Sequence, residues 1–449
     1  MKHIQCTTTA VLLIMLSRVF LAAVLELDTH SWQTVVMTSD GLGYLETAEC
    51  IESSNSPTLL FRMPGYPVFL ILLESIFSDE ILASILLQQL MHLVIAIVAA
   101  QIAIIHKPDC NRMWVMLCVL CTPVISIHTF LLLPDTLFLM FCCLGTWFAV
   151  LGTMKRSFTG SVYLTGLSGF VLGIGALVKP ILLYGFLPVS AYMLMVGRKS
   201  IKARLALVLV LVIAQHSVPS LWLLRNSLLF GYDRYTLQDG FELPARIAVL
   251  GGVMTTPPHE FKDSLETVYL RPDGTPDFER RDSVLMSMAV ESFRRSPWRV
   301  IIPHIVSWPS FFKPGVQYFA DVPVFQNNQR LFKLLKAIVF AISAGIGILF
   351  LFAAIAGGMR RRYGSLLALG SCWFVFTALS AGPLASNPRY GLPFMWLFST
   401  TAALVTADLA QLFRRGCKSR IRPFTEGAPC IPQSRAKMEQ GNENEPSKK

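Results

Sequence analysis

Long apolar runs, joined by short polar connections, fill most of this chain and constrain its fold more than any other feature. Of its 449 residues, 53% are hydrophobic and 15% are charged. A soluble globular domain is about 25% charged. Many of the runs approach or exceed the roughly 20 residues that an α-helix needs to cross the hydrocarbon core of a bilayer. The sequence therefore predicts an all-α polytopic membrane protein.

The apolar runs predict about ten transmembrane helices. They lie near residues 9–27, 81–105, 113–133, 137–154, 162–178, 181–196, 205–223, 331–356, 365–381 and 390–412. The first run also resembles a signal peptide, but its length and the many spans that follow favour a retained helix. The apolar stretch at 66–77 is short for a crossing, so we expect a juxtamembrane helix in the outer interface.

Basic residues concentrate in alternate short connections between the runs. The clusters are Lys107 with Arg112, Lys155-Arg156, Arg198-Lys199, Arg360-Arg361-Arg362 and Arg414-Arg415. The positive-inside rule makes these connections and both termini cytoplasmic. In this topology, residues 1–413 form the transmembrane domain, with a first outer loop at 28–80 and a long outer cap at 225–330. Residues 414–449, rich in Lys, Glu, Asn, Pro and Ser, are predicted to be a disordered cytoplasmic tail.

Charge and cysteine usage exclude several other classes. The formal net charge of +11 does not indicate nucleic-acid binding, because the basic residues lie in short clusters beside apolar runs. Cysteines inside apolar runs argue against a disulfide framework, and their spacing does not resemble a zinc site. These are Cys118, Cys121, Cys142, Cys143 and Cys372. The compact chain shows no retention signal, which favours a bacterial inner (plasma) membrane, and the endoplasmic reticulum of a eukaryote is the alternative setting.

Polar residues that interrupt the apolar pattern all fall on the outer side of the predicted topology. They are Asp40, Arg62, Asp135, Lys179, Arg225-Asn226 and Asn387-Pro388-Arg389-Tyr390. Lys179 and Arg389 stand at outer ends of spans, where the positive-inside rule disfavours basic residues. The convergence of two acids with several bases predicts an active site at the outer membrane surface.

Each of these residues also has a purely structural interpretation. The acids could cap helix N-termini, the basic residues could contact lipid headgroups, and the tyrosines could anchor in the interfacial aromatic belt. The acids are Asp40 and Asp135, the basic residues are Arg62, Lys179 and Arg389, and the tyrosines are Tyr66 and Tyr390. For Asp135 alone, capping and catalysis are about equally well supported.

Four stretches recur together in one family. They are residues 40–48 with 62–70 (Arg-Met-Pro-Gly-Tyr-Pro at its start), the glycine-rich run 169–180 ending in Lys179-Pro180, 224–231, and 388–393. Their order resembles that of the polytopic C-type (GT-C) glycosyltransferases, in the group similar to protein mannosyltransferases and lipid A aminoarabinose transferases. Gly41, Met63 and Asp135 depart from the commonest pattern, which leaves the acceptor open.

The resemblance implies a GT-C-like fold and the transfer of a hexosyl or pentosyl group from a polyprenyl-phosphate donor. The acceptor would be a lipid, a polysaccharide or a protein on the non-cytoplasmic face. Such a transfer needs a base for the acceptor proton and cations for the departing phosphate. A single displacement at the anomeric carbon inverts its configuration. Asp40 is the predicted base, and Asp135 is the second predicted catalytic acid, orienting the acceptor.

The remaining site residues follow from the same placement. Phosphate-binding residues are predicted at Lys179, Arg225 and Arg389, since arginine suits a bidentate grip on phosphate. Substrate-binding residues are predicted at Tyr44, Arg62, Tyr66, Asn387 and Tyr390, with Tyr66 stacking on the sugar. No cofactor is required. Asp40 and Asp135 together could hold Mg²⁺ or Mn²⁺, but the surplus of basic groups supports metal-free catalysis at least as well.

Two alternative functions remain open at the level of sequence. A transporter or lipid flippase predicts charged residues near the bilayer midplane and an inverted repeat. An O-antigen-type polymerase or ligase works on the outer face with a polymerised or diphosphate-linked substrate. The gathering of Asp40, Asp135 and Lys179 at one face favours the glycosyltransferase.

Overall fold

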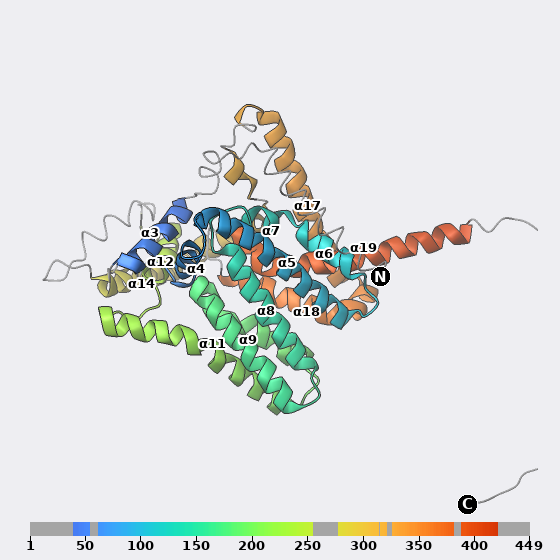
Figure 1. The fold of residues 1–449 in the computed structure, drawn as a ribbon, viewed down its shortest axis with the longest axis horizontal. Coiled ribbons are helices and arrows are strands. Elements are labelled where there is room, and N and C mark those ends of the chain that lie inside the picture. Colours follow the sequence, from blue (N-terminus) through green and yellow to red (C-terminus); the bar gives the residue numbers. More distant parts are fainter. Residues whose placement is uncertain are drawn as a thin grey trace, which may run out of the picture. The chain divides into compact units, whose positions relative to one another are not determined.

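The computed structural model in Figure 1 describes residues 39–53, 62–254, 277–313, 315–320, 326–380 and 388–420. Every regular element in these ranges is a helix, so the predicted all-α class is confirmed. Residues 1–407 form one compact unit and residues 408–449 form a second. The described part of the second unit, residues 408–420, is helical.

Seven helical segments in the described part of the chain are long and apolar enough to cross a membrane. The protein is therefore a multi-pass membrane protein. The first five are α5 (Glu80–His106), α8 (Asp135–Met154), α9 (Phe158–Val178), α11 (Ile201–Phe230) and α17 (Gln329–Ile355). The other two are Arg362–Ser380 within α18 (Gly357–Ser380), and Arg389–Phe413, which includes most of α19 (Leu392–Arg420). Two shorter apolar segments are α4 (Gly65–Glu74) and residues 180–196, which consist of η2 (Pro180–Tyr184) and α10 (Phe186–Val196).

The predicted span at 113–133 is wrong. This stretch forms two short helices, α6 (Arg112–Leu120) and α7 (Pro123–His128). Pro123 lacks a backbone N–H, and its ring disfavours the helical conformation at the residue before it. Thr122 accordingly has an extended conformation, with φ −68° and ψ 113°. A single helix therefore cannot run through this stretch.

Other predicted boundaries shift or lie outside the described residues. The predicted first span at 9–27 lies outside them, so the count of ten crossings stays a prediction. Helix α19 continues to Arg420, past the predicted start of the tail at residue 414. The rest of the predicted tail lies outside the described residues.

A buried glutamine organises the break between α9 and η2. The backbone oxygen of Gln215 in α11 lies 2.4 Å from where a Cβ atom on Gly173 would be, so only glycine allows this approach of α9 to α11. The Gln215 side chain donates hydrogen bonds to the carbonyls of Leu182 (2.6 Å) and Leu183 (2.9 Å) in η2. The carbonyl of Leu182 also accepts the backbone N–H of Gly185 at 2.9 Å, so the Gln215 side chain adds to the bonding within η2. Gln215 therefore ties η2, which follows Lys179, to α11.

An aromatic cluster anchors the start of α19. Phe311 and Phe312 of η3 (Trp308–Phe312) each lie 6.0 Å from the ring of Phe394. A Cβ atom on Gly391 would lie 2.5 Å from the carbonyl oxygen of Phe311, so η5 (Pro388–Gly391) packs directly on η3. This packing fixes the position of Arg389 in η5.

Helices also occupy the segments that flank the spans. The segment before α4 contains α3 (Ser39–Ser53), and the long segment after α11 contains α12 (Leu237–Leu250), α14 (Phe278–Arg295), α15 (Pro297–Ser307), η3 and η4 (Val316–Phe319). Helices α12 and α14 pack together through Ala245, Ala248 and Leu285, and a Cβ atom on Gly251 would lie 2.3 Å from the Ser292 side chain. We call residues 231–254 and 277–320 the cap.

Candidate active site

Asp40 joins two arginines from distant parts of the chain. It lies in the first turn of α3. Its Oδ1 accepts a hydrogen bond from Arg62 Nη2 at 3.3 Å, and its Oδ2 accepts one from Arg389 Nη1 at 2.6 Å. The Asp40 side chain is 37% exposed. The carboxylate therefore links α3 to η5 while keeping contact with water.

The two arginines control the charge of Asp40. Burial by itself raises the pKa of the Asp40 carboxyl, because a low dielectric disfavours the charged form. The charges of Arg389 and Arg62, and their hydrogen bonds, outweigh burial and hold that pKa below its ordinary value. Asp40 is therefore an ionised acceptor across the physiological pH range.

Tyr44 and Gly43 position Arg62 beside Asp40. The Arg62 guanidinium lies over the Tyr44 ring, with its Cζ 4.2 Å from the ring centroid. Such a cation–π contact stabilises the charged group and fixes its direction. A Cβ atom on Gly43 would lie 2.8 Å from Arg62 Nη2, so glycine leaves the space that the guanidinium occupies.

Tyr66 does not have the position predicted for it. Its side chain is fully buried, with its hydroxyl 3.4 Å from Ser84 Oγ. Its ring meets the Tyr44 ring edge to face at 5.1 Å between centroids. A sugar cannot stack on a ring that neighbouring side chains already cover. Tyr66 instead packs against the Tyr44 ring. The apolar stretch around Tyr66 does not show in sequence which of its side chains are buried.

Asp135 and Lys179 form a second acid–base pair. Asp135 begins α8 and is fully buried, and Lys179 Nζ donates to its Oδ1 at 2.5 Å. Lys179 follows the last residue of α9 and has an extended conformation, and Pro180 starts η2. Because a proline disfavours the helical conformation at the residue before it, α9 ends immediately before the lysine. Pro134 is the N-cap of α8, without a side-chain hydrogen bond, so Asp135 is not the cap that the sequence allowed.

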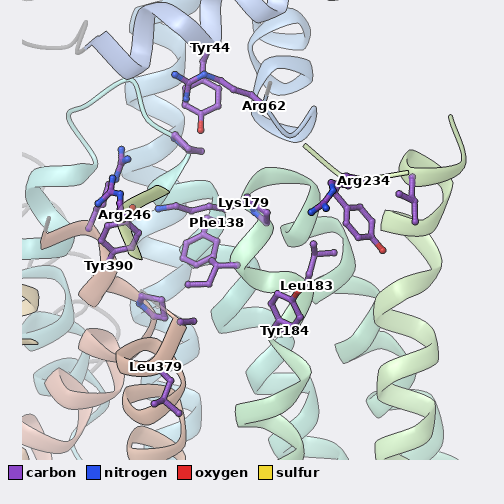
Figure 2. Close-up of a pocket in the computed structure, with 18 of the residues that line it drawn as sticks. Tyr44, Arg62, Phe138, Lys179, Leu183, Tyr184, Arg234, Arg246, Leu379 and Tyr390 are labelled. Atoms are coloured by element: carbon purple, nitrogen blue, oxygen red, sulfur yellow. The ribbon is translucent and has the colours of Figure 1, made fainter. Parts of the chain in front are cut away.

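Both pairs border one pocket of about 730 Å³, shown in Figure 2. Five of its lining side chains are basic: Arg62, Lys179, Arg234, Arg246 and Arg389. Its other walls are largely apolar and aromatic, and include Phe138, Leu183, Tyr184, Leu379 and Tyr390. Of the site residues predicted from the sequence, the pocket brings together Tyr44, Arg62, Lys179, Arg389 and Tyr390. Asp40 and Asp135 are not among the lining side chains, but Asp40 is 37% exposed beside Arg62 and Arg389, whereas Asp135 is fully buried.

Asp135 and Arg225 need correction as pocket residues. Asp135 is fully buried, so it contacts Lys179 and does not reach a substrate from its position. The Arg225 guanidinium lies 4.4 Å from the Trp222 ring and 5.3 Å from the Phe230 ring. Arg225 is not among the side chains that line the pocket. Asn387, which was predicted to bind substrate, lies outside the described residues.

Asn226, beside Arg225, explains why this stretch matters. It is buried, and its Nδ2 donates to the backbone carbonyls of Arg234 (3.0 Å) and Tyr235 (3.2 Å). Gly231 ends α11 in a left-handed conformation, with φ 61°, which lets the chain turn back toward Asn226. The turn brings Arg234 and Tyr235 to the pocket.

Several pocket residues were not predicted from the sequence. They are Asp233, Arg234, Tyr235 and Arg246 from the cap, and Tyr184 from η2. The cap has many charged residues, and its sequence does not show which of them turn inward. The one signal was Gly231 directly after a span, which marks a tight turn back to the membrane surface.

The described acids do not form a ready-made cation site. Both oxygens of Asp40 and one of Asp135 already accept hydrogen bonds from basic side chains. Within the described residues, no three His, Cys, Asp or Glu side chains converge as metal ligands would. A divalent ion at Asp40 would have to displace an arginine.

Comparison with known proteins gives one family match. The family model for dolichyl-phosphate-mannose-protein mannosyltransferases matches residues 61–222. This range contains Arg62 and the Asp135–Lys179 pair, and it ends at Trp222 in α11. Over this stretch the chain resembles membrane glycosyltransferases. The match is to a sugar-transferring class and not to a transporter.

One solved structure also matches the chain. It is the archaeal oligosaccharyltransferase AglB from Archaeoglobus fulgidus, in complex with an inhibitory peptide and a dolichol-phosphate. The match has a TM-score of 0.46 at 11% sequence identity and covers 91% of this chain. This chain spans about half of that one, 53%. No curated protein matches the chain.

Proposed function

We propose that this protein is a glycosyltransferase that moves one monosaccharide from a polyprenyl-phosphate donor to an acceptor on the non-cytoplasmic face of a cell's inner membrane, with inversion. The observation that carries the proposal is the two-sided character of the pocket. Basic side chains gather at Lys179, Arg62 and Arg389, and apolar side chains form other walls at Leu183 and Leu379. A lipid phosphate needs both surfaces, one for its anionic group and one for its first isoprene units.

Lys179 and Arg389 are the residues best placed for the donor phosphate. Each is fixed by a carboxylate, Lys179 by Asp135 at 2.5 Å and Arg389 by Asp40 at 2.6 Å. Cations that are already oriented stabilise charge on a departing phosphate without reorganisation during the reaction. Asp135 thus acts through Lys179, as a positioning residue.

Asp40 is the proposed base. The acceptor oxygen or nitrogen bonds to the anomeric carbon, and the bond from that carbon to the phosphate oxygen breaks. The electron pair leaves with the polyprenyl phosphate, and the acceptor proton passes to Asp40. A carboxylate of lowered pKa is a weak base for a free hydroxyl, so proton transfer belongs late in the displacement, when the acceptor has become acidic.

The ends of the helices support the proposed sidedness. Helices α8 and α19 begin at the pocket, where Pro134 and Pro393 line it. Helices α9 and α18 end there, where Lys179 and Leu379 line it. Their opposite ends carry the basic clusters. Lys199 donates to the carbonyl of Lys155, and Arg362 lies 4.0 Å from Asp109. The positive-inside rule places these basic ends in the cytoplasm and the pocket outside.

A transfer assay tests the proposed function. Purified protein in lipid nanodiscs is offered radiolabelled polyprenyl-phosphate monosaccharides, one at a time, with cell-envelope extract as acceptor. We expect label from at least one donor to enter the extract, with an inverted anomeric configuration in the product. Arg295→Gln, which removes an exposed cation that pairs with Glu291 outside the pocket, should transfer at the wild-type rate. Transfer from a nucleotide sugar, or no transfer by folded protein from any lipid donor, would contradict the proposal.

The pH dependence of transfer tests the role of Asp40. The rate should fall at acid pH as Asp40 becomes protonated. Because Arg389 and Arg62 lower the pKa of Asp40, wild-type transfer should persist below the ordinary carboxyl range. Arg389→Gln removes the larger charge effect and leaves burial, which raises that pKa. We therefore expect the acid limb of kcat/KM to move to higher pH in this variant. An unmoved limb would exclude Asp40 as the titrating base.

A further inference from the structure

A buried carboxylate in the cap gathers three donors around one point. Asp282 of α14 is almost fully buried, and its Oδ1 accepts bonds from Arg281 Nε (2.9 Å) and Nη2 (2.8 Å). Its Oδ2 accepts a bond from the Tyr232 hydroxyl (3.1 Å) and lies 3.3 Å from Arg234 Nε. Two arginines share one carboxylate, so the cluster keeps a net positive charge.

Arg234 is the member of this cluster that reaches the pocket. Its backbone carbonyl accepts the hydrogen bond from Asn226, and its Nε faces Asp282. Its side chain is 44% exposed and lines the pocket. Figure 2 shows Arg234 apart from Lys179 and Tyr390, above Leu183 and Tyr184. It therefore provides a basic point distinct from the one at Lys179.

The geometry suits one kind of ligand group. A guanidinium whose Nε is held by a carboxylate still offers its two terminal amino groups, which match the spacing of two oxygens in a phosphate or carboxylate. Fixing the Nε and the backbone in advance lowers the entropy that binding costs. A solvated surface arginine would need neither a buried partner nor a buried asparagine at its carbonyl.

We propose that Arg234, held by Asp282, is a second oxyanion-binding residue of the pocket and binds a phosphate or carboxylate group of a substrate. This inference rests on the proposed function. The oxyanion has two sources, the donor's phosphate or an acid group on the acceptor. Asp282 is a positioning residue in either case, because it touches Arg234 and not the pocket.

Binding and transfer measurements together test the inference. Radiolabelled undecaprenyl phosphate and undecaprenol are titrated against wild type, Arg234→Gln and Arg234→Lys in detergent. Acceptor KM and kcat are measured with cell-envelope extract and the active lipid donor. Arg295→Gln is the matched control, since it removes a cap cation that pairs only with the exposed Glu291 among the described residues.

Each outcome has a distinct meaning. If Arg234 binds the donor, Arg234→Gln weakens undecaprenyl phosphate by roughly 10-fold to 100-fold and leaves undecaprenol unchanged. If it binds the acceptor, acceptor KM rises by a similar factor at constant kcat. Lysine should restore part of either loss. Unchanged constants, or a fall in kcat alone, would overturn the inference. Wild type that does not prefer undecaprenyl phosphate to undecaprenol would overturn the proposed function, and this inference with it.

Asp282 is tested through its coupling to Arg234. Asp282→Asn should reproduce the effect of Arg234→Gln on the same constant, and it should add nothing in an Arg234→Gln background. Tyr232→Phe removes one hydrogen bond to Asp282 without changing charge, so it serves if Asp282→Asn does not fold. Additive effects in the double variant would show that Asp282 stabilises the cap without orienting Arg234.

Discussion

Asp40→Asn is expected to lower the rate of sugar transfer by about 10²-fold to 10⁴-fold, the usual contribution of a general base. Asparagine is close to aspartate in size and keeps an oxygen that Arg389 or Arg62 can bind. It cannot take the acceptor proton. The protein should therefore stay folded and bind polyprenyl phosphate while losing turnover. Single-turnover transfer and equilibrium donor binding, measured on the same preparation, separate the two properties.

Asp233 supplies the comparison for this experiment. It is the acidic residue among the described pocket-lining side chains, so it is the competing candidate for the base. Asp233→Asn should retain most of the transfer rate if Asp40 is the base. Retained turnover in Asp40→Asn, together with loss in Asp233→Asn, would assign the role to Asp233.

Lys179→Ala is expected to destabilise the protein by about 3–5 kcal/mol, because it leaves a buried charge without its partner. Asp135 is fully buried, and Lys179 provides its 2.5 Å hydrogen bond. The double variant Asp135→Leu/Lys179→Met replaces the pair with apolar side chains. It should recover most of the lost stability and still fail to transfer sugar. Stability is measured as the free energy of unfolding in mixed micelles.

The double variant separates the two functions of the pair. Recovered stability without transfer would show that Lys179 is needed for the reaction beyond its structural contact. Recovered transfer would remove Lys179 from the phosphate site. A stable Lys179→Ala protein would indicate that another cation neutralises Asp135.

The spans and the charged residues between them could be read from the sequence with good accuracy. Helix α5 (Glu80–His106) and helix α9 (Phe158–Val178) lie close to the predicted ranges, because hydropathy is a local property of the chain. The predicted span at 113–133 was wrong because Pro123 divides it. Counting apolar residues takes no account of the backbone restriction that a single proline imposes.

The site shows a sharper division between predictable and unpredictable residues. Arg62, Lys179 and Arg389 attract attention in sequence because charge at the outer end of an apolar run requires a reason. Tyr66 was predicted to stack on the sugar and Arg225 to bind the donor phosphate, but packing buries the first and stacks the second on aromatic side chains. Which side of a helix end a residue faces depends on neighbours far away in the chain.

The sequence is enough to predict an all-α membrane protein that resembles the GT-C glycosyltransferases and gathers its unusual charges at one end of its spans. Length, hydropathy and the order of short motifs carry that information, and none of them requires a distant contact. Which charges meet depends on the tertiary structure. Arg389 reaches Asp40 across 349 positions of sequence, and Asn226 turns Arg234 into the pocket. Such pairings depend on how helices pack, and packing is a property of the whole chain.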